Sequence, residues 1–415
     1  MKRINLYLFI SCCFVFITFH SIRCQGQSAT NSNQTGHWQN IVDGQHDVQS
    51  KTIISHKRAA QLYLESLDCL ENGNPERAIQ HIERIMYHST YAPLKLHLYA
   101  GQAFHLNHQY YKALKHYKRY RALQLFEENQ EEVDYANHLI SQVQHAFELS
   151  YQPSKNKLTA LHNSLAHHPL QQKYLMISPK LNEIYFAEAS HTQKNKIEVY
   201  KLSPHATTEL KKEKTNIRLP KKFRPLQFYH QGNALLLINV ITNQLFTASY
   251  QNGEWSSPIK LKGLPHLGTV SSASISDDGT LVIYSRVFPN DDMDLYAITK
   301  TAGKWSKAKR LAINSFQQEC FPNLTADGQT LYFSSARAES IGGFDIMVSQ
   351  YHAETQTWSA PKNLGLPINT PYDELQFAIH PNGKSGVVLS NYRQKGEKQC
   401  LYFFEQHEPD YSLSR

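Results

Sequence analysis

One phrase, W-S-x-x-x-x-L, occurs three times and constrains the fold of this chain more than any other feature of the sequence. It begins at Trp255, Trp305 and Trp358, so successive copies start 50 and 53 residues apart. A period of about 40–50 residues made of short strands is typical of a β-propeller, in which one period is one blade. The repeat therefore predicts a propeller in the C-terminal half, and it assigns the tryptophans to packing rather than to catalysis.

Other parts of the unit recur in step with this phrase. A strand lies ten to twelve residues before each tryptophan, and a second apolar strand lies before that one. Asp-Gly and Asn-Gly, which supply the positive φ of two-residue hairpin turns, precede the second strand. These turns are Asp278-Gly279, Asp327-Gly328 and Asn382-Gly383, and weaker copies occur at Gly232-Asn233 and Leu181-Asn182. We therefore count five units between about residues 172 and 405.

The first and last units lack the tryptophan strand, which predicts that one blade is completed by pairing of the two ends of the domain. A further repeated motif is Ile-Asn-Ser/Thr-x-x-x-Glu, which occurs at Ile313-Asn314-Ser315-x-x-x-Glu319 and at Ile368-Asn369-Thr370-x-x-x-Glu374. Because Glu319 and Glu374 recur at equivalent positions in two blades, we expect them to have a structural or rim role. The expected fold is a propeller of five or six blades over 171–408, followed by a tail at 409–415.

The N-terminus predicts export. Met1-Lys2-Arg3 precedes an apolar run from Ile4 to Ile22, as in a signal peptide with a basic start. Small residues at Cys24 and Gly26 suit cleavage before Gln27, so we assign 1–26 to the signal. Two alternatives stay open: the run is long enough for an uncleaved anchor, and Cys24 is a candidate lipidated N-terminus.

Cysteine number and charge narrow the class of protein. The expected mature chain retains Cys69, Cys320 and Cys400. This is no disulfide framework, and buried thiols are favoured over a Cys320–Cys400 bridge. Loss of three basic residues with the signal lowers the net charge from +8 to +5. Two basic clusters are best explained as a solvated loop between blades, with a patch for anionic lipid or glycan as the alternative. They are Lys211-Lys212-Glu213-Lys214 and Lys221-Lys222-Phe223-Arg224. No nucleic-acid-binding module is recognisable.

Between the signal and the propeller the period becomes helical. Residues 27–55 are polar and predict a flexible leader, whereas 56–150 show helical periodicity. The passages that start at Gly73 and His108 align 35 residues apart and place Ala78 and Ala113 at matching points, as Ser66 and Gly101 do one helix earlier. We expect these small residues where helices approach closely. Residues 131–149 predict a capping helix, and 151–170 a linker or packing arm.

Motifs for chemistry are scarce. The sequence has no G-x-S-x-G, H-E-x-x-H, P-loop or C-x-x-C. His105 and His108 are spaced for one helix face but lack a carboxylate partner, so we expect packing rather than a metal site. Asp291-Asp292-Met293-Asp294 lacks the glycine and the final glutamate of an EF-hand. We therefore expect no cofactor, no metal and no catalytic residue, which argues against an enzyme.

The residues from 319 to 374 carry a resemblance to a known family. Glu319-x-x-Pro322, Asp327-Gly328, Leu331-Tyr-Phe-Ser-Ser335 and Gly342-Gly-Phe-Asp-Ile346 resemble the TolB-like, WD-repeat-like (PD40) propeller repeat of bacterial envelope proteins. The helical passages resemble the tetratricopeptide repeat, although Leu62 and His97 stand where its tryptophan is expected. Together they look like Bacteroidetes outer-membrane-associated proteins that continue into an OmpA-like domain. This chain ends at Arg415, so the peptidoglycan-binding function of that domain is not carried over.

These observations lead to one functional expectation and one rival. We expect a non-catalytic, exported scaffold, periplasmic or outer-membrane-associated, that contacts envelope proteins through a helical groove and the propeller. Some relatives serve secretion or gliding machines, and peripheral contact with the membrane fits the same location. The expected groove residues are His97, Gln102 and His105. The rival is a hydrolase or glycan-binding protein that uses the central mouth of the propeller.

Overall fold

The fold is described from a computed structural model of the chain. It describes residues 53–90, 92–152, 156–160, 174–177, 184–189, 196–203, 211–380, 384–391 and 400–406. The expected signal with Cys24, the cleavage point before Gln27, most of the leader and the tail at 409–415 lie outside these ranges. Within these ranges, no helix has both the length and the apolar character needed to cross a membrane.

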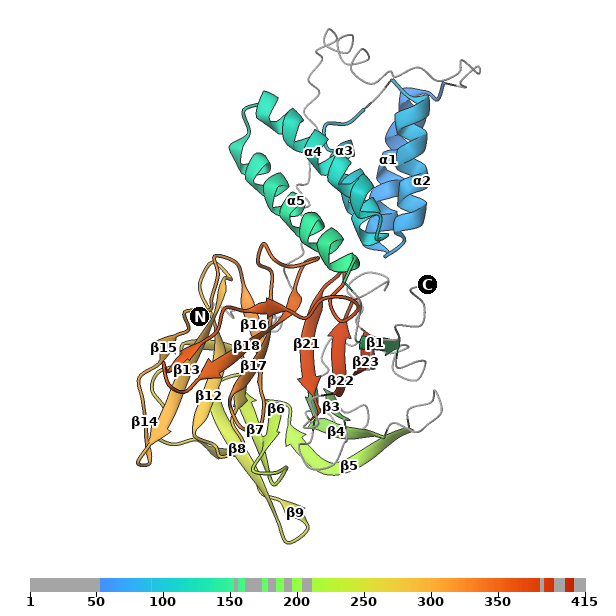
Figure 1. Cartoon of the computed structure of the whole chain (residues 1–415). Coiled ribbons are helices and arrows are strands. Elements are labelled where there is room, and N and C mark those ends of the chain that lie inside the picture. Colours follow the sequence, from blue (N-terminus) through green and yellow to red (C-terminus); the bar gives the residue numbers. More distant parts are fainter. Residues whose placement is uncertain are drawn as a thin grey trace, which may run out of the picture.

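Five helices form the N-terminal part, and each packs on the next along the chain (Figure 1). They are α1 (His56–Glu71), α2 (Pro75–His88), α3 (Leu96–Leu106), α4 (Tyr110–Phe126) and α5 (Gln130–Ser150). Local chemistry sets where three of them begin, because Ser55, Asn74 and Asn129 each accept a hydrogen bond from a backbone N–H in the first turn. Pro75 suits the first turn of α2, where a missing N–H costs nothing.

The small residues predicted at close helix contacts lie where expected. Ser66, Ala78 and Ala113 are fully buried. A Cβ atom built on Gly101 would lie 2.4 Å from the ring of Tyr117, so a larger residue at this position would displace that buried ring. This part of the chain is therefore a compact set of paired helices. His108 lies beyond the end of α3, with φ of 57°, and so does not share a helix face with His105 as we expected.

The strands form five antiparallel sheets. The first contains β2 (Tyr174–Ile177), β3 (Ile184–Ala189), β4 (Lys196–Ser203) and β5 (Lys211–Pro220). The second contains β6 (Phe223–Tyr229), β7 (Ala234–Asn239), β8 (Gln244–Gln251), β9 (Glu254–Trp255) and β10 (Ile259–Lys260). The third contains β11 (Thr269–Ile275), β12 (Leu281–Val287), β13 (Met293–Thr301), β14 (Lys304–Trp305) and β15 (Lys309–Arg310).

The remaining two sheets differ in how they are completed. The fourth contains β16 (Glu319–Leu324), β17 (Thr330–Ser335), β18 (Asp345–His352), β19 (Thr357–Trp358) and β20 (Lys362–Asn363). The last contains β21 (Glu374–Ile379), β22 (Ser385–Ser390), β23 (Cys400–Gln406) and β1 (Asn156–Ala160). Four sheets are thus blades formed by continuous stretches of chain. The last one joins the two ends of the domain.

This arrangement is a β-propeller. The first strands of the sheets, β2, β6, β11, β16 and β21, contact one another in a closed cycle. No sixth sheet occurs in the described part of the chain. Pairing of β1 with β23, with Leu158 opposite Phe404, confirms the prediction that chain ends complete one blade. It also corrects the assignment of 151–170 as a linker, because β1 has no neighbouring strand in sequence and its pattern gave no sign of a distant partner.

The repeated phrase is explained by a break in the outer strand. In three blades this strand is split into two short pieces, and the serine of W-S lies at the break. Its hydroxyl accepts a hydrogen bond from the third strand at 3.0 Å in every copy, and the leucine N–H later donates to the same strand. These bonds involve Ser256 with Ser249, Ser306 with Thr299, Ser359 with Gln350, Leu261 with Leu245, Leu311 with Leu295 and Leu364 with Ile346.

The tryptophans are less buried than a core residue. Trp255, Trp305 and Trp358 are half-buried, and each lies beside an apolar cluster between neighbouring blades. Trp255, for example, contacts Phe228 and Tyr250 at ring-centroid distances of 5.9 and 5.4 Å. The phrase is structural, as predicted, but the rings cover the edges of blades instead of filling their centre.

Candidate functional site

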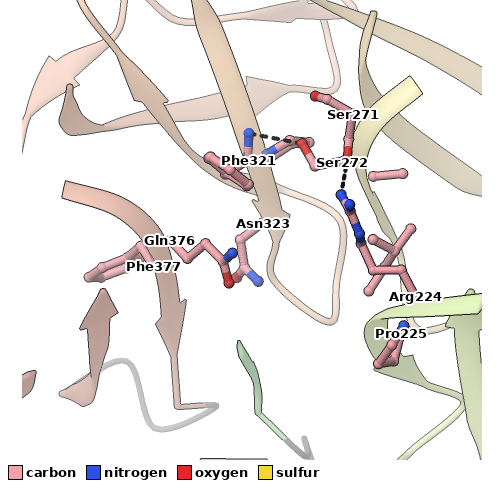
Figure 2. A pocket seen from close by; sticks show the side chains of 11 residues that line it. Arg224, Pro225, Ser271, Ser272, Phe321, Asn323, Gln376 and Phe377 are labelled. Atoms are coloured by element: carbon pink, nitrogen blue, oxygen red, sulfur yellow. Dashed lines mark hydrogen bonds between the residues drawn. The ribbon is translucent and has the colours of Figure 1, made fainter. Parts of the chain in front are cut away.

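The first candidate site is the central channel of the propeller (Figure 2). Its cavity measures about 50 Å³, well below the roughly 300–1,000 Å³ of typical small-molecule sites. The wall comes from the inner strands β6, β11, β16 and β21. The lining residues are Arg224, Pro225, Leu226, Ser271, Ser272, Ala273, Phe321, Pro322, Asn323, Gln376 and Phe377.

Many polar groups near the channel join one blade to the next. The Ser272 hydroxyl accepts from the backbone N–H of Phe321 at 3.0 Å. In the next layer, the Ser274 hydroxyl accepts from the N–H of Leu324 at 2.8 Å and donates to the amide oxygen of Gln227 at 2.5 Å. These side chains therefore stabilise the contact between inner strands, where the main-chain pairing of each sheet ends.

Among the lining residues of this cavity, Arg224 is the one charged side chain, and none is Asp, Glu or His. Its guanidinium donates to the carbonyl oxygen of Ser271 at 3.3 Å. Hydrolysis by paired carboxylates needs two acidic groups that flank the scissile bond. The described wall of the channel does not supply such a pair.

Glu319 and Glu374 lie away from the channel wall and have matching partners. Each is fully buried. Glu319 accepts from the hydroxyls of Ser315 and Ser335 at 2.6 and 2.9 Å, and Glu374 accepts from those of Thr370 and Ser390 at 2.7 and 2.8 Å. Burial raises the pKa of Glu319. In Glu374, burial and the nearby charge of Asp345 raise the pKa. The geometry confirms the predicted structural role, in which each carboxylate fixes the connection that enters its blade.

A buried carboxylate orders the loop that follows β17. Asp345 accepts from the backbone N–H groups of Ile341 and Gly342 at 2.7 and 3.2 Å, and from the Asn363 amide at 2.6 Å. Burial, together with the charge of Asp373, raises the pKa of Asp345 to about 7. The G-G-F-D motif is therefore a device that holds residues 336–344 in one conformation.

That loop fastens the propeller to the helices. Ile341 is fully buried and belongs to the apolar core of the helical segment. The amide of Gln142 in α5 donates to the carbonyl oxygen of Gly342, and the Ser141 hydroxyl donates to that of Ala338 at 3.3 Å. Figure 1 shows α5 as the helix nearest to the sheets. The helical segment and the propeller consequently share part of one core.

The three residues predicted for a helical groove do not form one open surface. His105 is only 5% exposed and packs against the rings of Tyr110 and Tyr117, so it lies in the core and not on an open surface. Burial lowers its pKa to about 4. His97 is half-buried, and its Nδ1 lies 3.0 Å from Nδ1 of His116. Gln102 is half-buried as well. The helical periodicity of α3 was visible in the sequence, but which of its faces points into the core was not.

A second candidate site lies where the two parts of the chain meet. It is a cleft of about 570 Å³ between the start of α4, the end of α5 and Leu366 of the propeller. Half of its lining side chains are Tyr, Phe or Leu, and Tyr111 is 73% exposed. The lining residues are His108, Gln109, Tyr110, Tyr111, Lys112, Phe147, Ser150 and Leu366. Sequence reasoning missed this cleft because its walls are brought together by the docking of the two parts.

Exposed apolar residues also mark one end of the propeller. Val240 and Ile241 lie between the second and third strands of their blade, and Phe316 precedes β16. All three are exposed, and Phe316 has no cover at all. In the next-to-last sheet, the equivalent connections at 336–344 and 364–373 contact the helices through Ile341 and Leu366. These side chains therefore lie at the end of the propeller that carries the helical segment. The sequence alone did not favour either end.

The other residues considered for chemistry have structural partners. Asp294, from the acidic run at 291–294, forms a two-bond ion pair with Arg310 at 2.7 and 2.6 Å. Lys214 lies in β5, not in a loop as expected, and pairs with Glu198 at 2.6 Å. Cys69 and Cys320 are buried, whereas the side chain of Cys400 is not described. Within the described ranges, no three His, Cys, Asp or Glu side chains cluster as metal ligands would.

Comparison with known proteins gives distant structural similarity alone. No family model matches this chain, and no curated protein matches it in sequence. TolB from Acinetobacter baumannii aligns with 58% of this chain and 66% of its own, at 14% identity and a TM-score of 0.30. A thermostable family-43 glycoside hydrolase aligns with 58% and 93%, at 13% identity and a TM-score of 0.39. A gluconolactonase from Xanthomonas campestris aligns with 63% and 93%, at 10% identity and a TM-score of 0.36. At these values the assignment of a propeller rests on the sheet topology of the chain itself.

Proposed function

We propose that this protein is a non-catalytic scaffold that holds partner proteins together. The observation that carries the proposal is the shared core at Ile341, which fixes the helical segment on the propeller. Because the junction is fixed, the cleft beside α4 and the exposed apolar loops keep the same position relative to each other at one end of the molecule. Contiguous exposed apolar groups mark interaction surfaces in soluble proteins, and Val240 and Ile241 are neighbours in one of these loops. The channel, by contrast, offers no pair of acid and base groups in its described lining.

Location and partners complete the proposal. We infer that the N-terminal signal directs export, and that the protein acts in the periplasm or at the outer membrane beside envelope proteins, in a secretion or gliding assembly. The basis is the apolar run at 4–22 and the resemblance of the propeller repeat to TolB-like (PD40) envelope proteins. We also propose that the helices are tetratricopeptide-like. Support comes from the small residues Ala78 and Ala113, both buried at matching points.

Site-specific photocrosslinking in cells tests the scaffold. A photoreactive residue would replace Ile241, Phe316 or Tyr111, which are exposed. Control positions are Lys304 and Glu354, exposed residues of the outer strand turns. We expect discrete adducts with the same few proteins at the first three positions and none at the controls. Adducts that are equally frequent everywhere, or absent everywhere, would contradict the proposal.

The alternative is that the channel mouth binds a glycan. It is favoured by one observation: the neutral amides of Asn323 and Gln376 lie beside each other in the cavity, with the half-buried Phe321 in the same wall (Figure 2). Amides and aromatic faces suit sugar hydroxyls and sugar rings. Calorimetry with glycan fragments tests this reading. Binding that is lost in Asn323→Ala but not in Tyr111→Ala would favour the channel over the scaffold surfaces.

A further inference from the structure

Helix α4 carries an exposed basic face. Lys112, Lys115 and Arg119 are spaced i, i+3 and i+7, so they lie along one side of the helix. Lys112 and Lys115 are exposed, and Arg119 is half-buried. The sequence of α4, from Tyr110 to Phe126, contains no acidic residue. Over the described residues, none of the three forms an ion pair with a carboxylate.

The electrostatic surroundings of a neighbouring histidine agree with this picture. His116 lies on the same helix, and its pKa is lowered to about 3. Burial is the main cause, followed by the neighbouring His97, and the positive charges of Arg119, Lys115 and Lys112 add to it. No carboxylate contributes in the opposite direction. Among the described residues, no carboxylate pairs with the basic face of α4, so a negatively charged partner would meet a favourable potential there.

One end of this face opens into the cleft between α4, α5 and the propeller. Lys112 belongs to both, since it lines the cleft of about 570 Å³. Beside it the lining combines apolar and aromatic side chains with polar ones. Tyr110 is buried, whereas Tyr111 and Phe147 are exposed. The ring of Phe147 also packs against that of Tyr151, with 5.0 Å between centroids. A cleft with exposed aromatic rings next to a row of cations fits a chain that carries an apolar side chain among acidic ones.

We propose that this cleft and the basic face of α4 bind an acidic segment of a partner protein, with one aromatic or large apolar side chain of that segment inserted beside Tyr111 and Phe147. The proposal rests on the scaffold function and names its partner class and site. Recognition combines burial of the apolar anchor with charge pairing along α4, which raises the rate of encounter and selects the partner. An anionic membrane fits the site less well, because a flat surface cannot fill a cleft and three cations are fewer than the roughly 4–8 that lipid-binding clusters use.

Fluorescence anisotropy with the full chain tests the proposal. The probe is a labelled peptide with one phenylalanine flanked on both sides by glutamates. Two matched peptides replace the phenylalanine by serine, or all glutamates by lysines. We expect saturable binding of the acidic aromatic peptide, at least about tenfold weaker binding of both matched peptides, and loss of affinity as salt shortens the Debye length from about 30 Å at 0.01 M to about 8 Å at 0.15 M.

Variants locate the site. The combined variant Lys112→Glu, Lys115→Glu and Arg119→Glu should weaken binding about tenfold or more. The control variant Lys262→Glu, Lys304→Glu and Lys307→Glu changes three exposed lysines of the propeller by the same total charge, and it should bind as the unchanged protein does. Tyr111→Ala with Phe147→Ala should remove the preference for phenylalanine over serine while leaving the salt dependence.

Several outcomes would overturn the inference. These are equal binding of the acidic and basic peptides, equal loss in both charge variants, no binding of the acidic aromatic peptide, or binding to vesicles of anionic lipid in place of the peptide. Photocrosslinking at Ile241 and Phe316 distinguishes this failure from failure of the scaffold. If discrete adducts form there while the peptide does not bind, the scaffold function stands and the acidic-segment site is wrong.

Discussion

Asn314 and Asn369 show how single side chains substitute for missing strand pairs. Each asparagine pairs its amide with both backbone groups of one residue on the third strand of its blade. The oxygen of Asn314 accepts from the N–H of Leu295 at 2.8 Å, and its nitrogen donates to the carbonyl oxygen of the same residue at 2.9 Å. Asn369 makes the same two hydrogen bonds with the N–H and the carbonyl oxygen of Ile346, at 2.7 and 2.9 Å. The repeated Ile-Asn motif is thus a hydrogen-bonding unit that ends the outer strand in these two blades.

The smallest residue in the loop that fastens the two parts also has a specific role. A Cβ atom on Gly342 would lie 2.4 Å from the carbonyl carbon of Pro371, and backbone cannot move aside as a side chain can. We expect Gly342→Ala to lower the free energy of unfolding by about 1–3 kcal/mol, as measured by urea denaturation. Gly303→Ala is the control for adding a methyl group, because no atom lies within 4 Å of its Cβ position. It should cost only the strain of its positive φ, about 1–2 kcal/mol. A Gly342→Ala variant as stable as the unchanged protein would exclude the proposed overlap.

Asp345 makes stability depend on pH. Burial raises its pKa to about 7 in the folded chain, whereas an unfolded aspartate titrates near 4. The folded state therefore binds more protons between these values, so the stability contributed by protonated Asp345 is fully present below about pH 4 and is lost as the pH rises to about 7. We expect Asp345→Asn to flatten this fall in a series of urea midpoints from acid to neutral pH. A variant curve parallel to that of the unchanged protein would show that another group titrates.

At the scale of elements, the outer strands of the blades connect sequence repeats to packing. Trp305 is half-buried, and its ring lies beside Lys300, 5.6 Å from the ammonium. Because only part of the ring is removed from water, we expect Trp305→Ala to lower the free energy of unfolding by about 1–3 kcal/mol, less than the roughly 3–5 kcal/mol of a fully buried aromatic residue. Thermal unfolding with Trp255→Ala and Trp358→Ala as parallel cases checks this. A difference between the three copies would mean that the repeat is not equivalent in all blades.

How far the sequence predicts each element depends on whether its partner is local. Hairpins opened by Asp278-Gly279 and Asp327-Gly328 were predictable because the turn and both strands lie within one blade, and the glycines have φ of 72° and 69° as expected. Strand β1 was not, since its partner β23 lies at the other end of the domain. The same limit applies to the candidate site. Lys112 and Tyr111 were visible as residues, but the cleft exists only because Leu366 is brought beside them.

The whole molecule depends on the contact between its two parts. Ile341 of the propeller fills a place in the helical core and is fully buried there. An isolated segment of residues 56–150 would leave that place open to water. We therefore expect this segment alone to be less stable than it is in the full chain, although its own contacts are local.

Truncation of the same side chain tests this coupling. We expect Ile341→Ala to destabilise the protein by about 2–5 kcal/mol, from lost burial and the cavity that remains. Hydrogen exchange should rise first in α5, which donates Gln142 and Ser141 to the loop. Ile259→Ala, at a 59% exposed position, is the control and should change little. Faster exchange confined to the propeller would show that Ile341 does not join the two parts.

Closure of the ring by β1 has a consequence for the order of synthesis. Residue 156 of this strand pairs with residue 406, so its partner is made about 250 residues later. Until then the other strands of its blade have not been made. During this time β1, which follows the helices in the chain, has no partner strand on either edge. Contacts so distant in sequence are slow to form and leave strand edges open to wrong pairing. A chaperone that holds the growing chain would therefore protect this protein most while its last blade is still missing.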